Sequence, residues 1–253
     1  MPQGEVKAVI TTAPSGDAAE ARELAARFGL RAEERAGRTL PELLAGGAPV
    51  LVLGSSRADL YAGGRTFRAS AGMAHLRVLR ARKGEIDPLV RAAQLQPGER
   101  VLDCTLGLGG DSLVAAQAVG PEGSVLGLEA SPLLAAFTLA GLRRLAPPVD
   151  QVARRIEVRC ADHRDGIPEG FDVILFDPMF RAPLEAGPLF ELLRQNAEHA
   201  PLGPEHLDEA RRKARRGVLV KDAWPGRELG RLGLRPLEAR RAPRIVFGWA
   251  GAG

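Results

Sequence analysis

The chain has 253 residues, of which 45% are hydrophobic and 26% are charged, as in an ordinary soluble globular protein. No apolar run approaches the roughly 20 residues that span a bilayer, and the N-terminus lacks the features of a secretion signal. The two cysteines, Cys104 and Cys160, form neither a CxxC motif nor a Cys/His cluster, which argues against a disulfide framework and a metal site. We therefore expect a cytoplasmic protein without a membrane contact or a bound metal.

The net charge is +4, and arginine supplies nearly all of the positive charge. Arginine suits phosphate groups and stacked bases better than lysine does. This charge is equally compatible with nucleic-acid binding and with a solvated, arginine-rich surface. The run "ARRKARR" at 210–216 is a candidate contact for a phosphate backbone, although such a run is more often a solvated helix face.

The pattern of apolar and capping residues over residues 1–70 predicts a small N-terminal α/β domain. Its first helix has Asp17 as N-cap, an apolar stripe and a stop at Gly29. In chain order we expect a strand at 6–12, a helix at 17–29, a helical stretch at 39–47, a strand at 49–55 and a polar, hairpin-like segment at 57–70.

A helical connector at 71–97, with a helix starting at Asp87, leads into a domain at 98–253 in which strands and helices alternate. Such alternation predicts a mostly parallel, Rossmann-like α/β sheet covered on both faces, with its ligand beyond the carboxyl ends of the strands. We expect strands at 100–105, 123–129, 155–162, 171–178 and 216–222, helices at 110–120 and 131–146, and a C-terminal antiparallel hairpin of 234–241 with 244–250, which makes seven strands.

The segment "VLDCTLGLGGDSL" at 101–113 reads as a strand, a glycine turn and the start of a helix. Gly107, Gly109 and Gly110 allow a tight turn and a close approach to a ligand. Ser112 stands where the dinucleotide fingerprint requires its last glycine, and no lysine completes a phosphate-binding loop. Neither phosphate motif is therefore complete.

Acidic residues flank this turn and end the neighbouring strands. Asp103 and Asp111 would oppose a pyrophosphate, at on the order of 4 kcal/mol per contact at ~4 Å, but they would attract the ammonium and sulfonium groups of S-adenosylmethionine. Glu129 ends the next strand, where an acid can accept both ribose hydroxyls, and Asp162 can accept the adenine amino group. The alternative for each acid alone is a helix cap or a solvated loop end.

The segment "DVILFDPMF" ends a strand with Asp177-Pro178-Met179-Phe180. It is similar to the (Asp/Asn)-Pro-Pro-(Tyr/Phe) motif of methyltransferases that act on exocyclic amines of bases. Asp177 and a carbonyl fixed by Pro178 can accept the two amine hydrogens and aim the lone pair at the methyl group, and Phe180 can stack on the base. The alternative is a simple Asp-Pro turn with a core aromatic.

Residues about 70–225 resemble the ribosomal RNA small-subunit methyltransferase J family, which methylates guanine N2. The likeness rests on the pattern D-x-T-x-G-x-G-x-D from Asp103 to Asp111, on the intact Asp-Pro-Met-Phe, on "AGMAHLRVLRARKGE" and on "VLVK". It implies cofactor contacts from Gly110, Asp111, Glu129, Ala130, Asp162, His163 and Asp177, and it makes His75, Arg77 and Lys221 candidates for contact with the substrate. The alternatives are that His75 contacts the cofactor or is structural, and that Lys221 is a solvated strand end. Gly110, Ala130, Asp162 and His163 stand where the family typically has Arg, Arg, Ser and Ser.

These features predict an S-adenosylmethionine-dependent methyltransferase that acts on an exocyclic amine of a base in RNA, with guanine N2 of small-subunit rRNA, free or in the ribosomal subunit, as the first candidate. Three alternatives remain open. The substrate could be a small molecule or a protein side chain, the protein could hold RNA and cofactor without catalysis, or it could be a nicotinamide-dependent oxidoreductase. The incomplete glycine pattern and the acidic turn argue against the last of these.

Overall fold

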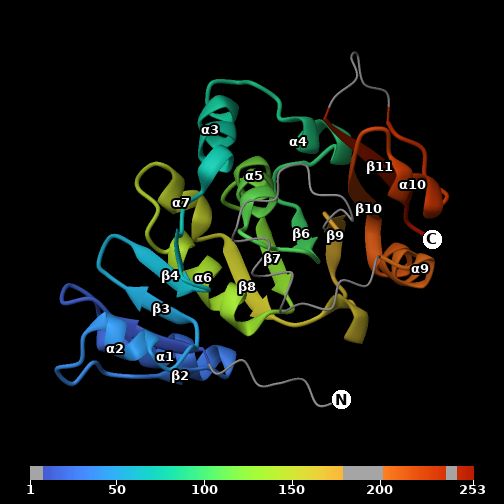
Figure 1. Ribbon diagram of the computed structural model, residues 1–253. Helices are drawn as coiled ribbons and strands as arrows, with labels where there is room; N and C mark the ends of the chain where they lie inside the picture. The colour runs from blue at the N-terminus through green and yellow to red at the C-terminus, as the bar shows by residue number, and fades with distance from the viewer. Residues whose placement is uncertain (1–7, 179–201, 238–243) are drawn as a thin grey trace.

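The computed structural model describes residues 8–178, 202–237 and 244–253. Within them the chain forms a five-stranded and a six-stranded sheet. Helix α6 (Pro132–Leu142) contacts strands of both sheets and therefore joins them. Figure 1 shows the smaller, N-terminal sheet at the lower left and the last strands of the larger one at the right.

The smaller sheet is built by the N-terminal segment. Its elements are β1 (Val9–Thr12), α1 (Ala18–Phe28), β2 (Arg31–Ala32), α2 (Leu40–Leu44), β3 (Val50–Leu53), β4 (Ala58–Ala62) and β5 (Arg65–Arg68). The strand order is β2-β1-β3-β4-β5, with β1 parallel to β2 and β3, and with β4 and β5 as an antiparallel hairpin. The predicted caps of α1 are confirmed, because the Asp17 carboxylate accepts a hydrogen bond from the Ala19 N–H and Gly29 adopts φ 65°.

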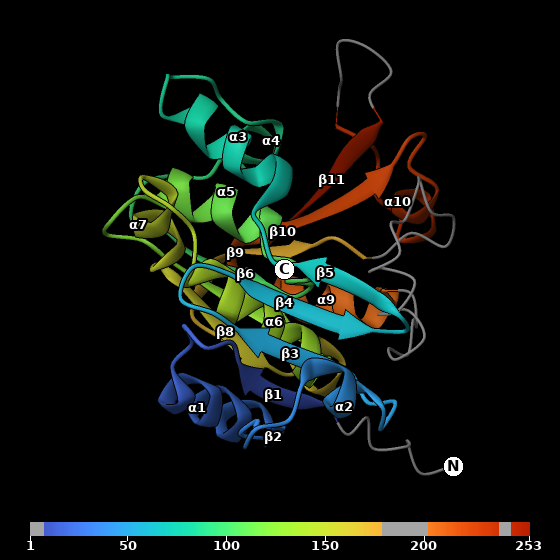
Figure 2. The ribbon, with the colours of Figure 1, turned by 60° about the vertical axis from the view of Figure 1, so that its left-hand side comes forward.

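The N-terminal unit shares its core with the rest of the chain. Buried residues of α1 and β3 belong to the same apolar cluster as those of α6. A partly buried ion pair of 2.6 Å links Arg144 to Glu20, and the Arg144 guanidinium also donates to the Gly54 carbonyl. Figure 2 shows the small sheet lying alongside the larger one, with α6 near the centre of the view.

The larger sheet consists of β6 (Arg100–Asp103), β7 (Ser124–Glu129), β8 (Ile156–Cys160), β9 (Phe171–Phe176), β10 (Ala214–Ala223) and β11 (Ile245–Gly251). Its order is β11-β10-β9-β6-β7-β8, and every pair is parallel except β10 with β11. The order reverses between β6 and β9, which makes the carboxyl ends of these two strands the expected ligand crevice.

Helices cover both faces of this sheet. The remaining helices are α3 (Gly72–Ala81), α4 (Pro88–Ala93), α5 (Gly110–Val119), α7 (Val149–Ala153), the 3-10 helix η1 (His163–Asp165), α9 (Pro204–Lys213) and α10 (Arg227–Arg231). Helices α3 to α7 bury their apolar residues in one cluster, and α9 and α10 bury theirs in a second cluster on the opposite face. Two buried faces explain why these strands are continuous apolar runs rather than alternating ones.

The strand count differs from the prediction at the C-terminal edge. Within the described residues the larger sheet has six strands, and the segment expected to form the first strand of the hairpin contributes an isolated antiparallel bridge between Pro236 and Gly248. Pro236 has no N–H to donate to a ladder, which limits pairing there. Part of that segment, residues 238–243, lies outside the described residues. The predicted helix at 131–146 ends at Leu142, and the short α7 that follows was not anticipated.

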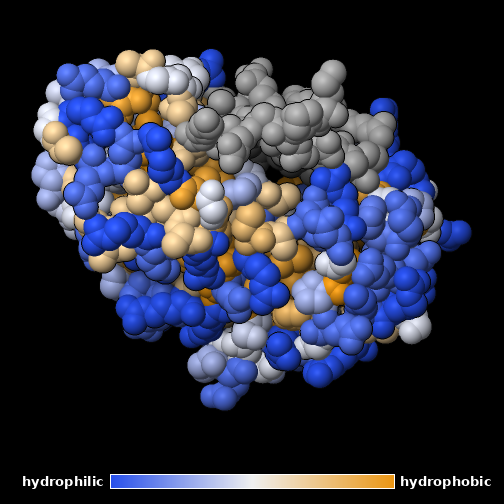
Figure 3. Space-filling model, turned by 90° about the horizontal axis from the view of Figure 1, so that it is seen from below, coloured by the Kyte–Doolittle hydropathy of each residue, from blue (hydrophilic) through white to orange (hydrophobic). Residues whose placement is uncertain are grey.

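Hydrophilic residues cover the margins of the face shown in Figure 3, and more apolar residues gather across its middle. Among the described residues, none of the helices combines the length and the apolar character needed to cross a bilayer. Most of the buried apolar residues that the structure describes belong to two clusters, of which one extends into the N-terminal unit.

Candidate active site

Acidic residues meet at the carboxyl edge of the larger sheet. Asp103 ends β6, Glu129 ends β7, and Asp177 directly follows β9. The ends of β6 and β9 are tied together, because the Asp177 N–H donates to the Thr105 hydroxyl at 2.6 Å and the Cys104 N–H donates to the Leu175 carbonyl. The structure therefore brings together the acids that the sequence predicted to share one edge.

The glycine turn connects β6 to α5 in the conformation that its residues permit. Gly107 and Gly109 adopt φ 53° and φ 75°, a region that side chains with a Cβ seldom occupy. The Thr138 hydroxyl of α6 donates to the Gly107 carbonyl at 2.7 Å, which fixes the turn against the helix. Gly110 is the first residue of α5, where an added Cβ would lie 3.8 Å from the Ala74 side chain of α3.

Burial raises the proton affinity of two of these acids. Burial raises the pKa of Asp103 to about 6, although its carboxylate accepts hydrogen bonds from the Ser112 hydroxyl and the Thr105 N–H. Burial likewise raises the pKa of Glu129 to about 7, against the opposing effect of hydrogen bonds from the N–H groups of Ser131 and Gly107. Each carboxylate oxygen has a further lone pair that could accept a ligand hydroxyl.

Lys221 and Arg77 link the remaining acids into a chain of ion pairs. The Lys221 ammonium lies 2.7 Å from an Asp111 oxygen and 2.6 Å from an Asp177 oxygen. The other Asp111 oxygen lies 2.6 Å from the Arg77 guanidinium, which also forms a bidentate pair with Asp87 at 2.8 Å. This series of ion pairs therefore runs from α3 and the start of α4, through the first turn of α5, to the ends of β10 and β9.

Burial and pairing act in opposite directions on these groups. Burial alone would raise the pKa of Asp111, but Lys221 and Arg77 together lower it. Burial raises the pKa of Asp177, against the opposing effect of Lys221. Burial would lower the pKa of Lys221, but Asp177 and Asp111 raise it. Lys221 therefore stays protonated, and it neutralises part of the negative charge of the edge.

The end of β8 carries the other predicted cofactor residues. Asp162 lies two residues beyond β8, and its carboxylate caps η1 and pairs with the Arg164 guanidinium, with the Nε atom 2.9 Å away. The His163 ring stands edge-on to Phe176, with ring centroids 5.2 Å apart, and burial lowers the pKa of this histidine. Ala130 directly follows β7, and its carbonyl accepts a weak contact from the Cys160 thiol.

The structure connects the remaining residues that the sequence predicted for the site less closely with its acids. His75 lies half-buried on α3, and the structure records no hydrogen bond or ion pair between its imidazole and the described residues. Pro178 follows Asp177 as expected, whereas Phe180 lies outside the described residues. The run at 210–216 does not form one helix face, because α9 ends at Lys213 and β10 begins at Ala214.

Three residues of the site were not identified from the sequence. Ser112 was considered only as a missing glycine, yet its buried hydroxyl holds Asp103. Asp87 was read only as a helix start, but it also anchors Arg77. Arg164 occupies the Asp162 carboxylate. The paired residues lie only 9, 10 and 2 positions apart in the sequence, but none of the motifs considered in the sequence marks such a pairing.

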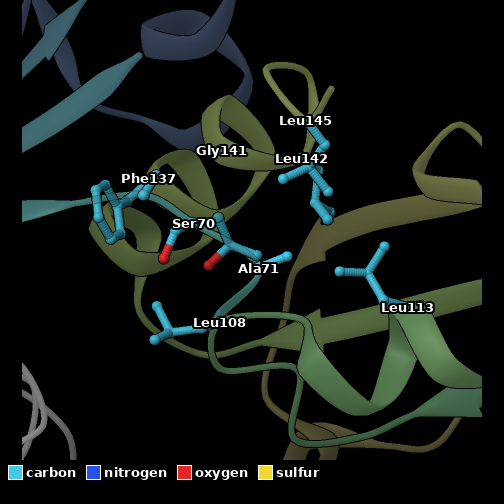
Figure 4. A pocket seen from close by; sticks show the side chains of 10 residues that line it. Ser70, Ala71, Leu108, Leu113, Phe137, Gly141, Leu142 and Leu145 are labelled. Atoms are coloured by element: carbon cyan, nitrogen blue, oxygen red, sulfur yellow. The ribbon is translucent and has the colours of Figure 1, made fainter. Parts of the chain in front are cut away.

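A small recess lies behind the glycine turn rather than among the acids. Leu108 of the turn, Leu113 of α5, and Phe137 and Leu142 of α6 line it together with Ser70 (Figure 4). The lining is mostly apolar, and Gly141 lets the chain between β5 and α3 approach α6 closely, since an added Cβ would lie 2.7 Å from that of Ala69. This recess supports the turn but offers no charged group to a ligand.

Comparison with known proteins identifies the family. Residues 67–186 match the family model described as "Putative SAM-dependent methyltransferase". The chain is also 36% identical over 201 residues to the uncharacterized protein YpiP of Bacillus subtilis, a match that covers 76% of this chain and 78% of that protein. The chain belongs to this family of SAM-dependent methyltransferases. The prediction that its cofactor is S-adenosylmethionine is thereby confirmed.

A solved structure and two shorter matches extend the comparison. The SAM-dependent methyltransferase NGO1261 from Neisseria gonorrhoeae has the same fold as this methyltransferase, with a TM-score of 0.66 at 21% identity over 96% of both chains. Ribosomal RNA small subunit methyltransferase J of Alcanivorax borkumensis is 40% identical over 83 residues, 33% of this chain and 32% of that protein. The 23S rRNA (uracil(1939)-C(5))-methyltransferase RlmD of Acinetobacter baumannii is 36% identical over 85 residues, 34% of this chain and 18% of that protein. The predicted Rossmann-like methyltransferase fold is confirmed, whereas these two partial matches leave the substrate open.

Proposed function

We propose that this methyltransferase modifies an exocyclic amine of a base in RNA, with guanine N2 of small-subunit rRNA as the first candidate. The observation that carries this proposal is the position of Asp177. Its carboxylate and the Pro178 turn stand directly after β9, at the strand-order reversal of the sheet and beside the acids of β6 and β7. The partial similarity to ribosomal RNA small subunit methyltransferase J supports the same substrate class.

The described residues fit S-adenosylmethionine. The turn from Gly107 to Gly110 has glycine at three of its four positions, and Glu129 keeps lone pairs directed to this edge after accepting two N–H groups. We propose that Glu129 accepts the ribose hydroxyls and that Asp103 and Asp111 face the amino-acid end. Ala130, Asp162 and His163 would then line the adenine side, with the Asp162 carboxylate shared with Arg164.

The cofactor supplies an electrophilic methyl group on a positively charged sulfur. An exocyclic amine is a poor nucleophile because its lone pair is conjugated to the ring. Asp177 can accept one amine hydrogen, and the carbonyl before or within the Pro178 turn can accept the other, so that the lone pair points at the methyl group. Holding the amine in this geometry is worth several orders of magnitude in rate.

Lys221 and Arg77 would partly neutralise the carboxylates of Asp177 and Asp111, which face the substrate. In the structure Lys221 pairs with Asp177 and Asp111, so the Asp177 carboxylate is held in place. An incoming base can compete for the Asp177 oxygen, and Lys221 can then contact a base oxygen or a phosphate. We assign His75 and Arg77 to the same wall, since both lie on α3.

Methylation of a base carbon is supported less well. Attack at C5 of uracil needs a nucleophile that first activates the ring. The Cys104 thiol is buried and its pKa is raised well above the ordinary value by burial, and burial also raises the pKa of the Cys160 thiol. A thiol with a raised pKa forms little thiolate. A small-molecule or protein substrate remains the main alternative to RNA.

The test uses methyl-labelled S-adenosylmethionine and ribosomal RNA from a strain deleted for this gene, followed by nucleoside analysis. Label in an amine-methylated nucleoside is the expected result. The substitution Asp177→Ala removes the acceptor of the amine hydrogen and should reduce methyl transfer by about 100-fold or more. Asp172→Ala is the matched control, because Asp172 lies at the opposite end of the same strand, where it pairs with Arg215. Label found in protein or in a small molecule, with none in RNA, would show the proposal to be wrong.

A further inference from the structure

An exposed tryptophan stands at the same edge of the sheet as the candidate site. Trp224 directly follows β10 and keeps 53% of its surface exposed. It lies three residues beyond Lys221, whose ammonium contacts Asp177 at 2.6 Å. At ~3.3 Å per residue in an extended chain, the backbone of Trp224 lies roughly 10 Å from that of Lys221. The position of this exposed aromatic beside the candidate site makes it available to a substrate, because an indole can stack on a base.

The backbone that carries Trp224 is held on both sides. The Trp224 N–H donates to the Arg244 carbonyl at 3.0 Å, which continues the pairing of β10 with β11. The buried Asp222 carboxylate accepts the N–H groups of Glu228 and Leu229 and so anchors α10 to the end of β10. Figure 1 shows β10, β11 and α10 side by side. The indole is therefore presented from a fixed support rather than from a free loop.

The surroundings of Trp224 are positively charged. Arg227 opens α10, Arg244 directly precedes β11, and both are exposed. Neither guanidinium forms an ion pair or a hydrogen bond with any part of the chain that the structure describes. The nearby acids are already engaged, since Asp222 caps α10 and Glu228 pairs with Arg231 at 2.9 Å. An exposed indole with two exposed arginines nearby in the chain and across the strand pair complements a chain of bases and phosphates.

The arginine-rich run at 210–216 is a weaker candidate for the same contact. Arg216 pairs with Glu99 at 2.6 Å, and Lys213 pairs with Glu209 at 3.1 Å. The run ends at the start of β10, at the opposite edge of the sheet from Lys221. Its cations are therefore largely neutralised within the chain and lie on the wrong side of the sheet for a substrate at Asp177.

We infer that Trp224, Arg227 and Arg244 form a binding surface for single-stranded RNA next to the reaction centre. The indole stacks on a base that flanks the modified nucleotide, and the two guanidinium groups contact the neighbouring phosphates. This inference deepens the proposed function and rests on it, because it places the RNA on one particular wall of the site. A target within structured RNA can reach Asp177 only after it is unstacked, and a stacking platform beside the site would favour that state.

The chain has two tryptophans, Trp224 and Trp249, which allows a direct binding test. In a Trp249→Phe variant, the emission of the single indole reports on Trp224 alone. With S-adenosylhomocysteine present, titration with a short single-stranded RNA of mixed sequence should quench this emission. An unchanged emission across RNA concentrations at which a labelled RNA binds, as judged by its anisotropy, would overturn the inference.

Substitutions can distinguish the stacking contribution of Trp224 from the charge contribution of the two arginines. Trp224→Ala should weaken RNA binding about 5- to 100-fold, and Trp224→Phe should restore most of the loss. Ile86→Ala removes another exposed apolar side chain, one that is 61% exposed and lies between α3 and α4, and should leave RNA affinity unchanged. Substituting both Arg227 and Arg244 by Gln should lower the slope of log affinity against log salt by about 1.4. Cofactor affinity should stay the same in all of these variants.

The outcomes distinguish this inference from the proposed function. If the wild-type protein methylates RNA and Trp224→Ala is as active at low RNA concentration as the wild type, the inference is wrong and the proposed function stands. If the wild-type protein transfers no methyl group to RNA, but RNA quenches Trp224 and binding falls in Trp224→Ala, the binding surface stands and the proposed reaction fails. Equal RNA affinity of the Ala, Phe and wild-type proteins would overturn the inference in either case.

Discussion

Glu129 gives the sharpest quantitative prediction, because the fold makes its ionisation unfavourable. Burial raises the pKa of this carboxyl to about 7 from an ordinary value of 4.5. The folded protein therefore binds a proton more tightly than the unfolded chain does, and stability contributed by the protonated form is present at low pH and is lost as the pH rises through about 7. The difference of about 2.5 in pKa corresponds to about 3 kcal/mol.

The substitution Glu129→Gln removes this titration while keeping the shape of the side chain. The wild type loses the contribution of Glu129 as the pH rises, whereas the variant has none to lose. Relative to the wild type, the free energy of unfolding of the variant should therefore increase by about 3 kcal/mol between about pH 4.5 and pH 7.5. Urea unfolding at several pH values, without cofactor, measures it. The same variant should bind S-adenosylmethionine more weakly, because an amide oxygen and an NH₂ group replace two acceptors.

Glu122→Gln is the control, since Glu122 is exposed in the turn before β7 and its substitution should change stability by less than about 0.5 kcal/mol at every pH. A difference between Glu129→Gln and wild type that stays flat from about pH 4.5 to pH 7.5 would refute the reasoning. It would mean that the Glu129 carboxyl is hydrated in the folded protein and that its environment does not penalise the charge.

Two further substitutions test the ion-pair chain and the packing behind the turn. Lys221→Met leaves two partly buried carboxylates without their shared cation. It should lower the free energy of unfolding by about 1–3 kcal/mol at neutral pH, less than for a fully buried pair because solvent screens Asp177, with a smaller loss in acid. Lys83→Met at an exposed position should change the free energy of unfolding by less than about 0.5 kcal/mol, and equal losses for both variants would contradict the ion-pair assignment. Gly141→Ala should cost about 1–3 kcal/mol by overpacking despite the better helix propensity of alanine, because the new Cβ would lie 2.7 Å from that of Ala69. The double variant with Ala69→Gly should recover part of that loss in thermal unfolding, and no recovery would contradict the proposed clash.

The sequence predicted the elements that carry their own local signals. Asp17 and the glycine at position 29 cap their helix as expected, since capping depends only on neighbouring backbone groups. The alternation of apolar runs and helices likewise predicted the parallel sheet, and with it the shared edge of Asp103 and Glu129. The expected seventh strand carried the same kind of pattern but is reduced to a bridge at Pro236 within the described residues, because pairing depends on a partner edge and not on the segment alone.

By itself, then, the sequence determined which residues can turn, cap or end a strand, and that acids would gather where parallel strands stop. Only the tertiary structure decided how those charges are balanced. Asp87 and Arg77 precede Lys221 by well over a hundred residues, yet they join one chain of ion pairs that passes through Asp111 to Asp177. Such pairing follows from the packing of α3 on α5 and of β10 on β9, and electrostatic energy depends on distances in space rather than on positions along the chain.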